Sequence, residues 1–295
     1  MSSLLAFPAD RLLPLLALCL VAGWLAAVLL REIAQRFGPQ LIRPGLTLWR
    51  AGWERPGAVL RRHAPRFSAW VERRFDPGRG DGLIVTLIVI AAIYAASLAA
   101  GLVEELMEVK ELEAFDKGVF AVTERWNTPT VVAVFRWITM LGNVQTLLAV
   151  VIVATGFLLA HGPRSFLLPT WIVILGSQLT TWGGKFALNR ARPEFIFDVT
   201  ASSPSFPSGH SANSLAVYGI IAYVIARDLG PARALHVYYW TLAAVLLIAL
   251  SRVMLHVHYP SDVLAGLLVG AFWLLLGIAI AERHRGRGLL ADRLD

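Results

Sequence analysis

The sequence predicts an all-α membrane protein: a polytopic helix bundle in which one extra N-terminal span precedes a six-span core. Two observations support this fold class. Hydrophobic residues make up 57% of the 295 residues and charged residues only 16%, whereas a soluble domain of this length needs far more polar surface. In addition, several apolar runs reach the roughly 20 residues that cross the hydrocarbon core of a bilayer. Most of the chain is therefore expected to contact lipid.

The expected spans follow from seven apolar runs. They cover residues 12–30, 83–103, 144–160, 166–184, 212–226, 236–250 and 263–281. The first run has the length of a signal-peptide core. However, Met1–Asp10 contains no basic residue, and no clear small-x-small cleavage site follows the run. We therefore expect a retained helix there.

The charges between these runs predict how the bundle is oriented. The segment 31–82 holds eleven Arg and only five acidic residues, and it is expected in the cytoplasm, the side that positive charge favours. The last run is followed by Arg283, Arg285, Arg287 and Arg293, which belong on the same side. The loop after the second run is acidic, with Glu104, Glu105, Glu108, Glu111, Glu113 and Asp116, and is expected outside. Alternation then places 185–211, 251–262 and the N-terminus outside.

The basic segment 31–82 mixes its arginines with aromatic residues. Pro44, Pro56 and Pro65 are expected to cut it into short pieces. Helices at the membrane surface and a solvated linker fit these pieces equally well. The formal net charge is +7, but the basic residues lie between apolar runs. We therefore expect lipid headgroups, and not nucleic acid, as their partner.

Three clusters of polar residues interrupt the apolar sequence on the predicted outer side. Charged groups at membrane depth are energetically costly, so each cluster requires a structural or functional explanation. The first contains Lys185 and, seven residues later, Arg192, followed by Pro193. This spacing puts both cations on one face of a helix that Pro193 is expected to end. Such a pair can grip a dianionic phosphate. Taken alone, the cluster is interpreted as a group of charges that sets topology.

The second cluster is Pro207-Ser208-Gly209-His210, directly before the fifth apolar run. It marks a helix N-terminus, where free N–H groups and the helix dipole favour an anion. Gly209 allows close approach of the backbone, Ser208 offers a hydroxyl, and His210 exchanges protons near neutral pH. A capped helix start with an incidental histidine is an equally good interpretation of this cluster alone.

The third cluster runs from Ser251-Arg252 through His256 and His258 to Asp262. Pro260 suits the first turn of the seventh run and puts Asp262 in that turn. A carboxylate there can accept from one imidazole nitrogen of His258 and leave the other as a nucleophile. A favourable interaction of Asp262 with the helix dipole is the simpler alternative.

Together the three clusters resemble the type 2 phosphatidic acid phosphatase superfamily, which also includes vanadium haloperoxidases and glucose-6-phosphatase. The family signature reads K-x6-R-P, P-S-G-H and S-R-x5-H-x3-D. Every position is matched in order and spacing: Lys185 to Arg192-Pro193, Pro207 to His210, and Ser251-Arg252 through His258 to Asp262. The resemblance covers about residues 83–281.

The resemblance implies a role for each signature residue. His258 attacks phosphorus and forms a phosphohistidine, Asp262 orients and supports it, and His210 protonates the leaving oxygen and then activates water. The phosphoryl oxygens are held by Lys185, Arg192, Ser208, Gly209 and Arg252. No metal or other cofactor is expected, because three cations and a helix end take its place. His256 lies outside the signature, and we expect it to be structural or interfacial.

The resemblance also implies what the protein does. We expect an integral-membrane lipid phosphatase in the cell inner membrane, with its site facing outward, its C-terminus in the cytoplasm, and a membrane lipid as substrate. Undecaprenyl diphosphate, phosphatidylglycerol phosphate, phosphatidic acid and lipid A phosphates are all candidates. A phosphotransferase with the same phosphohistidine and a non-catalytic lipid-phosphate binding or transport protein are the alternatives. The chain is expected to divide into a span and basic linker at 1–82, a six-span domain at 83–285 and a tail at 286–295. The sequence does not indicate an oligomeric state.

Overall fold

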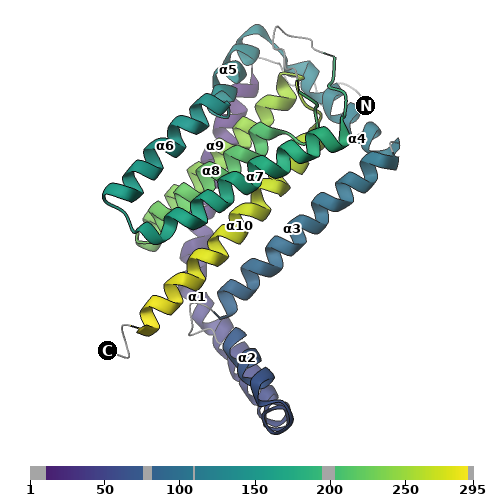
Figure 1. The fold of residues 1–295 in the computed structure, drawn as a ribbon. Coiled ribbons are helices and arrows are strands. Elements are labelled where there is room, and N and C mark those ends of the chain that lie inside the picture. Colours follow the sequence, from purple (N-terminus) through teal and green to yellow (C-terminus); the bar gives the residue numbers. More distant parts are fainter. Residues whose placement is uncertain (1–10, 76–81, 109, 195–202, 292–295) are drawn as a thin grey trace, which may run out of the picture.

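A computed structural model describes residues 11–75, 82–108, 110–194 and 203–291, which fold into helices without any strand among them (Figure 1). The seven predicted runs lie in the long helices α1 (Leu12–His63), α3 (Leu83–Glu108), α6 (Val144–Ala160), α7 (Leu167–Leu188), α8 (Gly209–Ala226), α9 (Pro231–Met254) and α10 (Pro260–Ala291). The first residue of the fourth run, Phe166, instead closes a short 3-10 turn before α7. Shorter helices are α2 (Pro65–Arg74), α4 (Lys110–Thr123) and α5 (Pro129–Met140). The all-α prediction is confirmed.

Five stretches of the described chain are long and apolar enough to cross a membrane, judged by length and composition. They are Leu12–Gly38, Leu83–Glu108, Pro129–Ala160, Pro231–Met254 and Pro260–Arg283. Helices α7 and α8 lie outside this set and carry polar side chains, which pair with one another inside the bundle. Asn213 of α8 donates to Gln178 of α7 at 2.6 Å and accepts from Ser177 at 2.9 Å. A membrane helix bundle is therefore established, while the count of seven spans stays a prediction.

Helix α8 packs directly against α10 because two glycines of α10 face it. A Cβ on Gly266 would lie 2.4 Å from the carbonyl oxygen of Ser208, and one on Gly270 would lie 2.5 Å from that of Ala212. Both distances are shorter than any real contact of this kind, so only glycine lets the backbones approach this closely. The four-residue spacing of Gly266 and Gly270 is the small-xxx-small pattern typical of such close helix contacts. It joins the N-terminal ends of α8 and α10.

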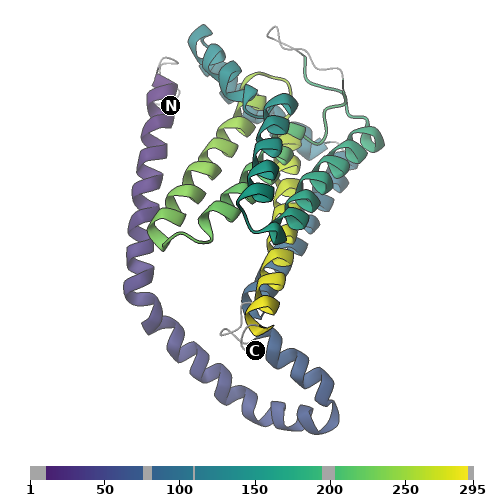
Figure 2. The same cartoon turned by 60° about the vertical axis from the view of Figure 1, so that its left-hand side comes forward.

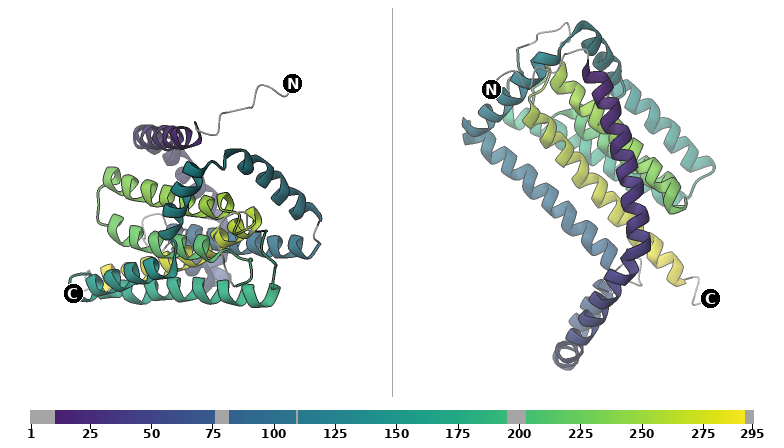
Figure 3. Two further views of the ribbon diagram at one scale, coloured as in Figure 1. Left: turned by 90° about the horizontal axis from the view of Figure 1, so that it is seen from above. Right: turned by 180° about the vertical axis from the view of Figure 1, so that it is seen from behind.

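The N-terminal part of α1 lies against the outside of the bundle, beside α9 (Figure 3). Its contacts are specific: the hydroxyl of Tyr239 donates to the carbonyl oxygen of Leu20, and Trp24 Nε1 donates to His236 Nδ1 at 3.2 Å. The first turn of α1 is also buried, since Leu12 belongs to an apolar cluster with Phe135 of α5. The extra N-terminal helix is thus tied to the remainder of the bundle.

The basic segment after the first apolar run differs from the prediction. Helix α1 continues to His63 through Pro44 and Pro56, so only Pro65 lies at a helix boundary. Helix α2 then folds back on α1 (Figure 2), where Arg61 and Glu72 form an ion pair at 2.5 Å. A proline removes one hydrogen bond and bends a helix without having to end it, provided that the turns on both sides persist. The expectation of several short pieces is wrong.

The acidic loop expected after the second run is itself helical: its acidic residues lie in the last turns of α3 and in α4. In addition, Asp116 of α4 is only 1% exposed. Prolines and caps explain where the neighbouring helices begin: Pro129 opens α5 behind Thr128, whose hydroxyl accepts from Val131 N at 3.3 Å. Helix α10 extends to Ala291, and residues 292–295 of the predicted tail, including Arg293, lie outside the described chain.

Candidate active site

Four helix ends meet at one end of the bundle: the C-terminal ends of α7 and α9 and the N-terminal ends of α8 and α10. The C-terminal end of α10 and the hairpin of α1 and α2 lie at the opposite end (Figures 1 and 2). All three predicted clusters are at this meeting point. A main-chain hydrogen bond joins the second and third clusters, since Ser208 N donates to Asp262 O at 2.9 Å.

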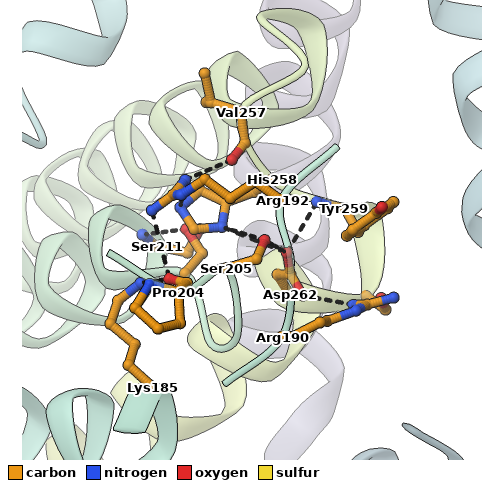
Figure 4. A network of polar contacts seen from close by, with 12 residues as sticks. Lys185, Arg190, Arg192, Pro204, Ser205, Ser211, Val257, His258, Tyr259 and Asp262 are labelled. Carbon is orange, nitrogen blue, oxygen red and sulfur yellow. Dashed lines mark hydrogen bonds and ion pairs between the residues drawn. The ribbon is translucent and has the colours of Figure 1, made fainter. Parts of the chain in front are cut away.

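The imidazole of His258 lies between an acid and a guanidinium (Figure 4). Its Nδ1 is 3.4 Å from Asp262 Oδ2, and its Nε2 is 3.2 Å from Arg192 Nη1. Arginine can only donate, so Nε2 must be the unprotonated nitrogen and Nδ1 must carry the proton. Both contacts therefore select the tautomer with its proton on Nδ1, in which the lone pair of Nε2 faces the cations.

Burial keeps this imidazole neutral. His258 is 2% exposed, and loss of hydration lowers its pKa to about 3, although the hydrogen bond with Asp262 opposes the shift and the charges of Arg252 and Arg192 add to it. At neutral pH Nε2 is thus unprotonated, as a nucleophile requires.

The carboxylate of Asp262 is fully buried and heavily hydrogen-bonded. Its Oδ2 accepts from the main-chain N–H of Tyr259 at 2.9 Å, from the hydroxyl of Ser205 and from His258 Nδ1. Its Oδ1 accepts from Arg190 at 2.5 Å. Helix α10 supplies the position, because Pro260 begins the helix and puts Asp262 in its first turn.

Lys185 and Arg192 reach the same site by a route that the spacing did not predict. Helix α7 ends at Leu188, where Asn189 takes a left-handed conformation (φ 41°) and returns its N–H to the carbonyl of Lys185. Arg192 therefore lies beyond the helix, and the expectation that both cations share one helix face is wrong. The chain turns back instead, so that both side chains donate to the carbonyl oxygen of Pro204.

Arg252 lies in the last turn of α9 and is 5% exposed. Its Nη1 donates to the hydroxyl of Thr139 in α5 at 2.7 Å. Its Nε is buried and has no hydrogen-bond partner within the described residues. A buried guanidinium with an open donor is suited to an anionic ligand.

The N-terminus of α8 carries the second cluster. The hydroxyl of Ser208 caps the helix, accepting from Ser211 N at 3.5 Å and from the Ser211 hydroxyl at 3.0 Å. Gly209 is the first residue of the helix, and a Cβ there would make only ordinary contacts. Lack of space therefore does not explain glycine at this position.

His210 is placed by a residue that the sequence did not single out. Its Nε2 lies 2.8 Å from Asn143 Oδ1, at the turn between α5 and α6. Because Oδ1 accepts, Nε2 carries a proton and Nδ1 is the nitrogen left for proton exchange. Burial, and after it the charge of Arg252, lower the pKa of His210 well below its ordinary value, so this imidazole lies near the cations.

His256 points elsewhere. It adopts a left-handed conformation (φ 53°), stacks on Phe120 of α4 with ring centroids 4.5 Å apart, and lies 3.4 Å from Glu124. The stretch around it is a tight turn. The outcome for His256 is the one expected: its ring does not face the cations.

The structure adds several residues to those of the signature: Thr139, Asn143, Arg190, Ser205 and Asp116. A signal was present for Asp116, because Leu112 and Phe120, one turn before and after it, are apolar. A carboxylate on the apolar face of a helix is costly and indicates a buried partner. Arg190 lies inside the first cluster, but nothing in the spacing distinguished it from a solvated arginine. The described residues hold no group of three or more acidic, histidine or cysteine side chains that could bind a metal; metal independence stays a prediction.

Known proteins resemble this chain in the region of the site. The family described as the PAP2 superfamily matches residues 166–285. Phosphatidylglycerophosphatase B of Bacillus subtilis (strain 168) is 38% identical over 142 residues, which cover 39% of this chain and 69% of that protein. Lipid A 1-phosphatase of Rhizobium johnstonii is 34% identical over 109 residues, covering 34% of this chain and only 41% of that protein.

A solved structure shares the fold. The crystal structure of the first transmembrane PAP2 type phosphatidylglycerolphosphate phosphatase from Bacillus subtilis aligns with a TM-score of 0.56 and 29% identity, covering 65% of this chain and 94% of that one. The range matched by the PAP2 superfamily, residues 166–285, contains the three cations, the α8 N-terminus and the His258–Asp262 pair. This chain therefore belongs to the PAP2 superfamily of membrane lipid phosphatases.

Proposed function

We propose that this protein hydrolyses the phosphomonoester of a membrane lipid through a phosphohistidine on His258. The observation that carries the proposal is the pair of contacts that bracket His258: Asp262 holds Nδ1–H, and Nε2 faces the guanidinium of Arg192. A protein that merely binds phosphate needs the cations but gains nothing from a buried neutral imidazole of fixed tautomer. This arrangement favours catalysis over binding or transport.

The reaction divides into two steps. First, the lone pair of His258 Nε2 attacks phosphorus; a P–N bond forms and the P–O bond to the lipid breaks. His210, which takes up a proton once the bound phosphate dianion offsets the neighbouring cations, gives that proton to the leaving oxygen. The positive charge that develops on the phosphohistidine is balanced by Asp262. Then His210 takes a proton from a water molecule, whose oxygen attacks phosphorus, and the P–N bond breaks to release inorganic phosphate.

The phosphoryl group would lie among Lys185, Arg192, Arg252 and the N-terminus of α8, with Ser208 and Gly209 at its edge. Three fixed cations and a helix end stabilise the charge on its equatorial oxygens without reorganising during the reaction. The burial of Lys185 and Arg252, 8% and 5% exposed, strengthens these interactions because water screens them little.

Phosphatidylglycerol phosphate is the first candidate substrate. The support is the relative named for that activity, most of whose length is covered, and the solved structure that shares the fold. Undecaprenyl diphosphate, phosphatidic acid and lipid A phosphates are the alternatives to compare. We also propose, from the charge pattern of the loops, that the site faces the outside of the inner membrane and the hairpin of α1 and α2 faces the cytoplasm.

The test is a panel assay on the purified full chain in detergent micelles. Each lipid phosphate is supplied in turn, and free phosphate is measured with and without an acceptor lipid. Release of phosphate in the absence of acceptor is expected; transfer to the acceptor with no free phosphate would instead identify a phosphotransferase. Absence of turnover with every lipid would contradict the proposal.

The nucleophile is tested by two matched histidine variants. His258→Ala should abolish turnover and the acid-labile phosphoenzyme that a labelled substrate leaves on the wild type. His256→Asn serves as the control, because asparagine tolerates the left-handed conformation found there (φ 53°). It should retain turnover. Normal turnover by His258→Ala would exclude the mechanism.

A further inference from the structure

An ion pair that belongs to no signature position lies directly behind Asp262. Arg190, in the coil after α7, contacts two carboxylates at once: its Nη1 donates to Asp262 Oδ1 at 2.5 Å and its Nη2 to Asp116 Oδ2 at 2.8 Å. The side chains of Asp116 and Asp262 are 2% and 0% exposed, and that of Arg190 is 15% exposed. Water therefore screens these three charges little, and their geometry is tightly constrained.

Asp116 also holds the start of α10. Its Oδ1 accepts from the main-chain N–H of Ser261 at 2.9 Å and its Oδ2 from the Ser261 hydroxyl at 2.7 Å. Ser261 is the neighbour of Asp262 and a further acceptor for Arg190, at 2.8 Å. Helix α4 is thereby fastened to the one turn of α10 that carries the acid of the site.

The guanidinium of Arg190 has no freedom to turn toward a substrate. One face is covered by the ring of Tyr259, whose centroid lies 4.2 Å from the guanidinium carbon. The donors on Nη1 and Nη2 are directed at Asp262, Ser261 and Asp116. Unlike Arg192, which contacts His258, Arg190 therefore acts on the carboxylate and not on the phosphoryl group (Figure 4).

The consequence concerns the rotation of the Asp262 carboxylate. Because Arg190 engages Oδ1, the other oxygen, Oδ2, is left for His258 Nδ1, and it is the oxygen that lies 3.4 Å from that nitrogen. Without Arg190 the carboxylate is held only at Oδ2, by Tyr259 N–H and Ser205, and it can tilt away from the alignment that supports the proton on Nδ1. The orientation of the imidazole, and with it the direction of the nucleophile on Nε2, then becomes variable even though Arg192 still favours the same tautomer.

We propose that Asp116 and Arg190 are positioning residues, which lock the carboxylate of Asp262 so that it fixes the orientation of His258. The inference rests on the proposed phosphohistidine mechanism. It also extends the site beyond the region that matches the PAP2 superfamily, since Asp116 lies outside residues 166–285. Helix α4 thus completes the site, and it does so without touching the substrate.

The decisive experiment compares Asp116→Asn with Glu113→Gln in the full-length chain, using the lipid phosphate that the wild type hydrolyses. Both changes convert a carboxylate to an amide on the same helix, but Glu113 is exposed and pairs only with Lys117 in the described contacts. Partners of this kind around metal-bound histidines contribute about 10–100-fold in activity. We expect a kcat loss of that size for Asp116→Asn with KM changed less than about twofold, and no change for Glu113→Gln.

A double-mutant cycle separates positioning from a merely structural role. If Asp116 acts through Asp262, Asp116→Asn should cost little further activity in an Asp262→Asn background, where the carboxylate to be positioned is already gone. Equal losses in both backgrounds would overturn the inference, as would an unchanged kcat per folded molecule accompanied only by a lower unfolding temperature. Ser261→Ala and Arg190→Lys provide milder variants should Asp116→Asn fold poorly; Arg190→Lys retains one charge and should restore part of the loss seen with Arg190→Gln.

The two proposals fail in different ways. A wild type that releases no phosphate from any lipid would contradict the proposed function. A wild type that turns over, together with Asp116→Asn and Arg190→Gln variants that form the phosphoenzyme at the wild-type rate, would contradict the positioning role alone.

Discussion

The contact between α8 and α10 leads to a prediction in which a second glycine of the same contact, Gly270, serves as the control. Gly266 faces the carbonyl oxygen of Ser208, and a Cβ placed on it would be 2.4 Å from that oxygen and 3.0 Å from Ser211 Cβ. Ordinary contacts of a Cβ begin at 3.4 Å, so Gly266→Ala must separate the two backbones by about 1 Å at this point. Ser208 N is bonded to the carbonyl of Asp262, and the movement is therefore transmitted to the acid of the site.

Two effects should follow from this substitution. Overpacking of this kind costs about 1–3 kcal/mol of stability. A displacement of about 1 Å at catalytic groups costs about 100-fold in rate. Gly270→Ala is the matched control, since its Cβ would lie 2.5 Å from the carbonyl oxygen of Ala212, one turn further from the site. We expect similar losses of stability for the two variants but a much larger loss of kcat for Gly266→Ala.

The assay measures thermal unfolding in detergent and the kcat for phosphate release on the same preparations. Two results would refute the reasoning. One is a wild-type kcat for Gly266→Ala despite a lower unfolding temperature. The other is an equal loss of kcat for Gly270→Ala, which would show that general loosening of the α8–α10 contact, and not displacement of the site, lowers the rate.

Three further predictions concern protons and charge. The pKa of His258 is about 3 in the folded chain and about 6.5 when unfolded. Between these pH values the unfolded chain binds more protons, so the folded chain loses stability as pH falls from about 6.5 toward 3. Between pH 7 and 5 the wild type should lose about 2 kcal/mol more unfolding free energy than His258→Gln; equal losses would contradict the burial argument. Asn143→Ala removes the acceptor of His210 Nε2–H and should lower kcat about 10-fold or more. Asn143→Asp retains an acceptor and should lower kcat less, so the test is the ratio of the kcat values of the two variants. Activity should survive excess chelator because Lys185, Arg192 and Arg252 supply the positive charge, and its loss in phosphate-release assays would demand a metal.

Much of the fold and of the site could be predicted from the sequence, for local reasons. Apolar runs of sufficient length predict membrane helices, and all seven predicted runs lie in helices. The signature residues could be named because their spacing is short within each cluster. Pro260 places Asp262 in the first turn of α10, four residues after His258, and no distant contact is needed for that pairing.

Local reasoning failed where competing conformations of similar energy were open to the chain. Pro44 and Pro56 were expected to end helices but lie within α1. Asn189 ends α7 in a left-handed cap before the expected stop at Pro193. A helix can continue through a proline at the loss of one hydrogen bond, and Asn189 ends α7 early through a left-handed cap, so residue type alone did not fix either outcome.

The sequence by itself determined that this is a helical membrane protein that carries the three PAP2 signature clusters, because composition, apolar length and motif spacing are properties of the chain alone. Only the tertiary structure decided which distant groups serve that site. Asp116 is 146 positions before Asp262 in the chain, and Asn143 is 67 before His210, so no pattern of nearby residues could pair them. Their partners are selected by the cost of burying a polar group without a hydrogen bond, and that cost arises only after the helices have packed.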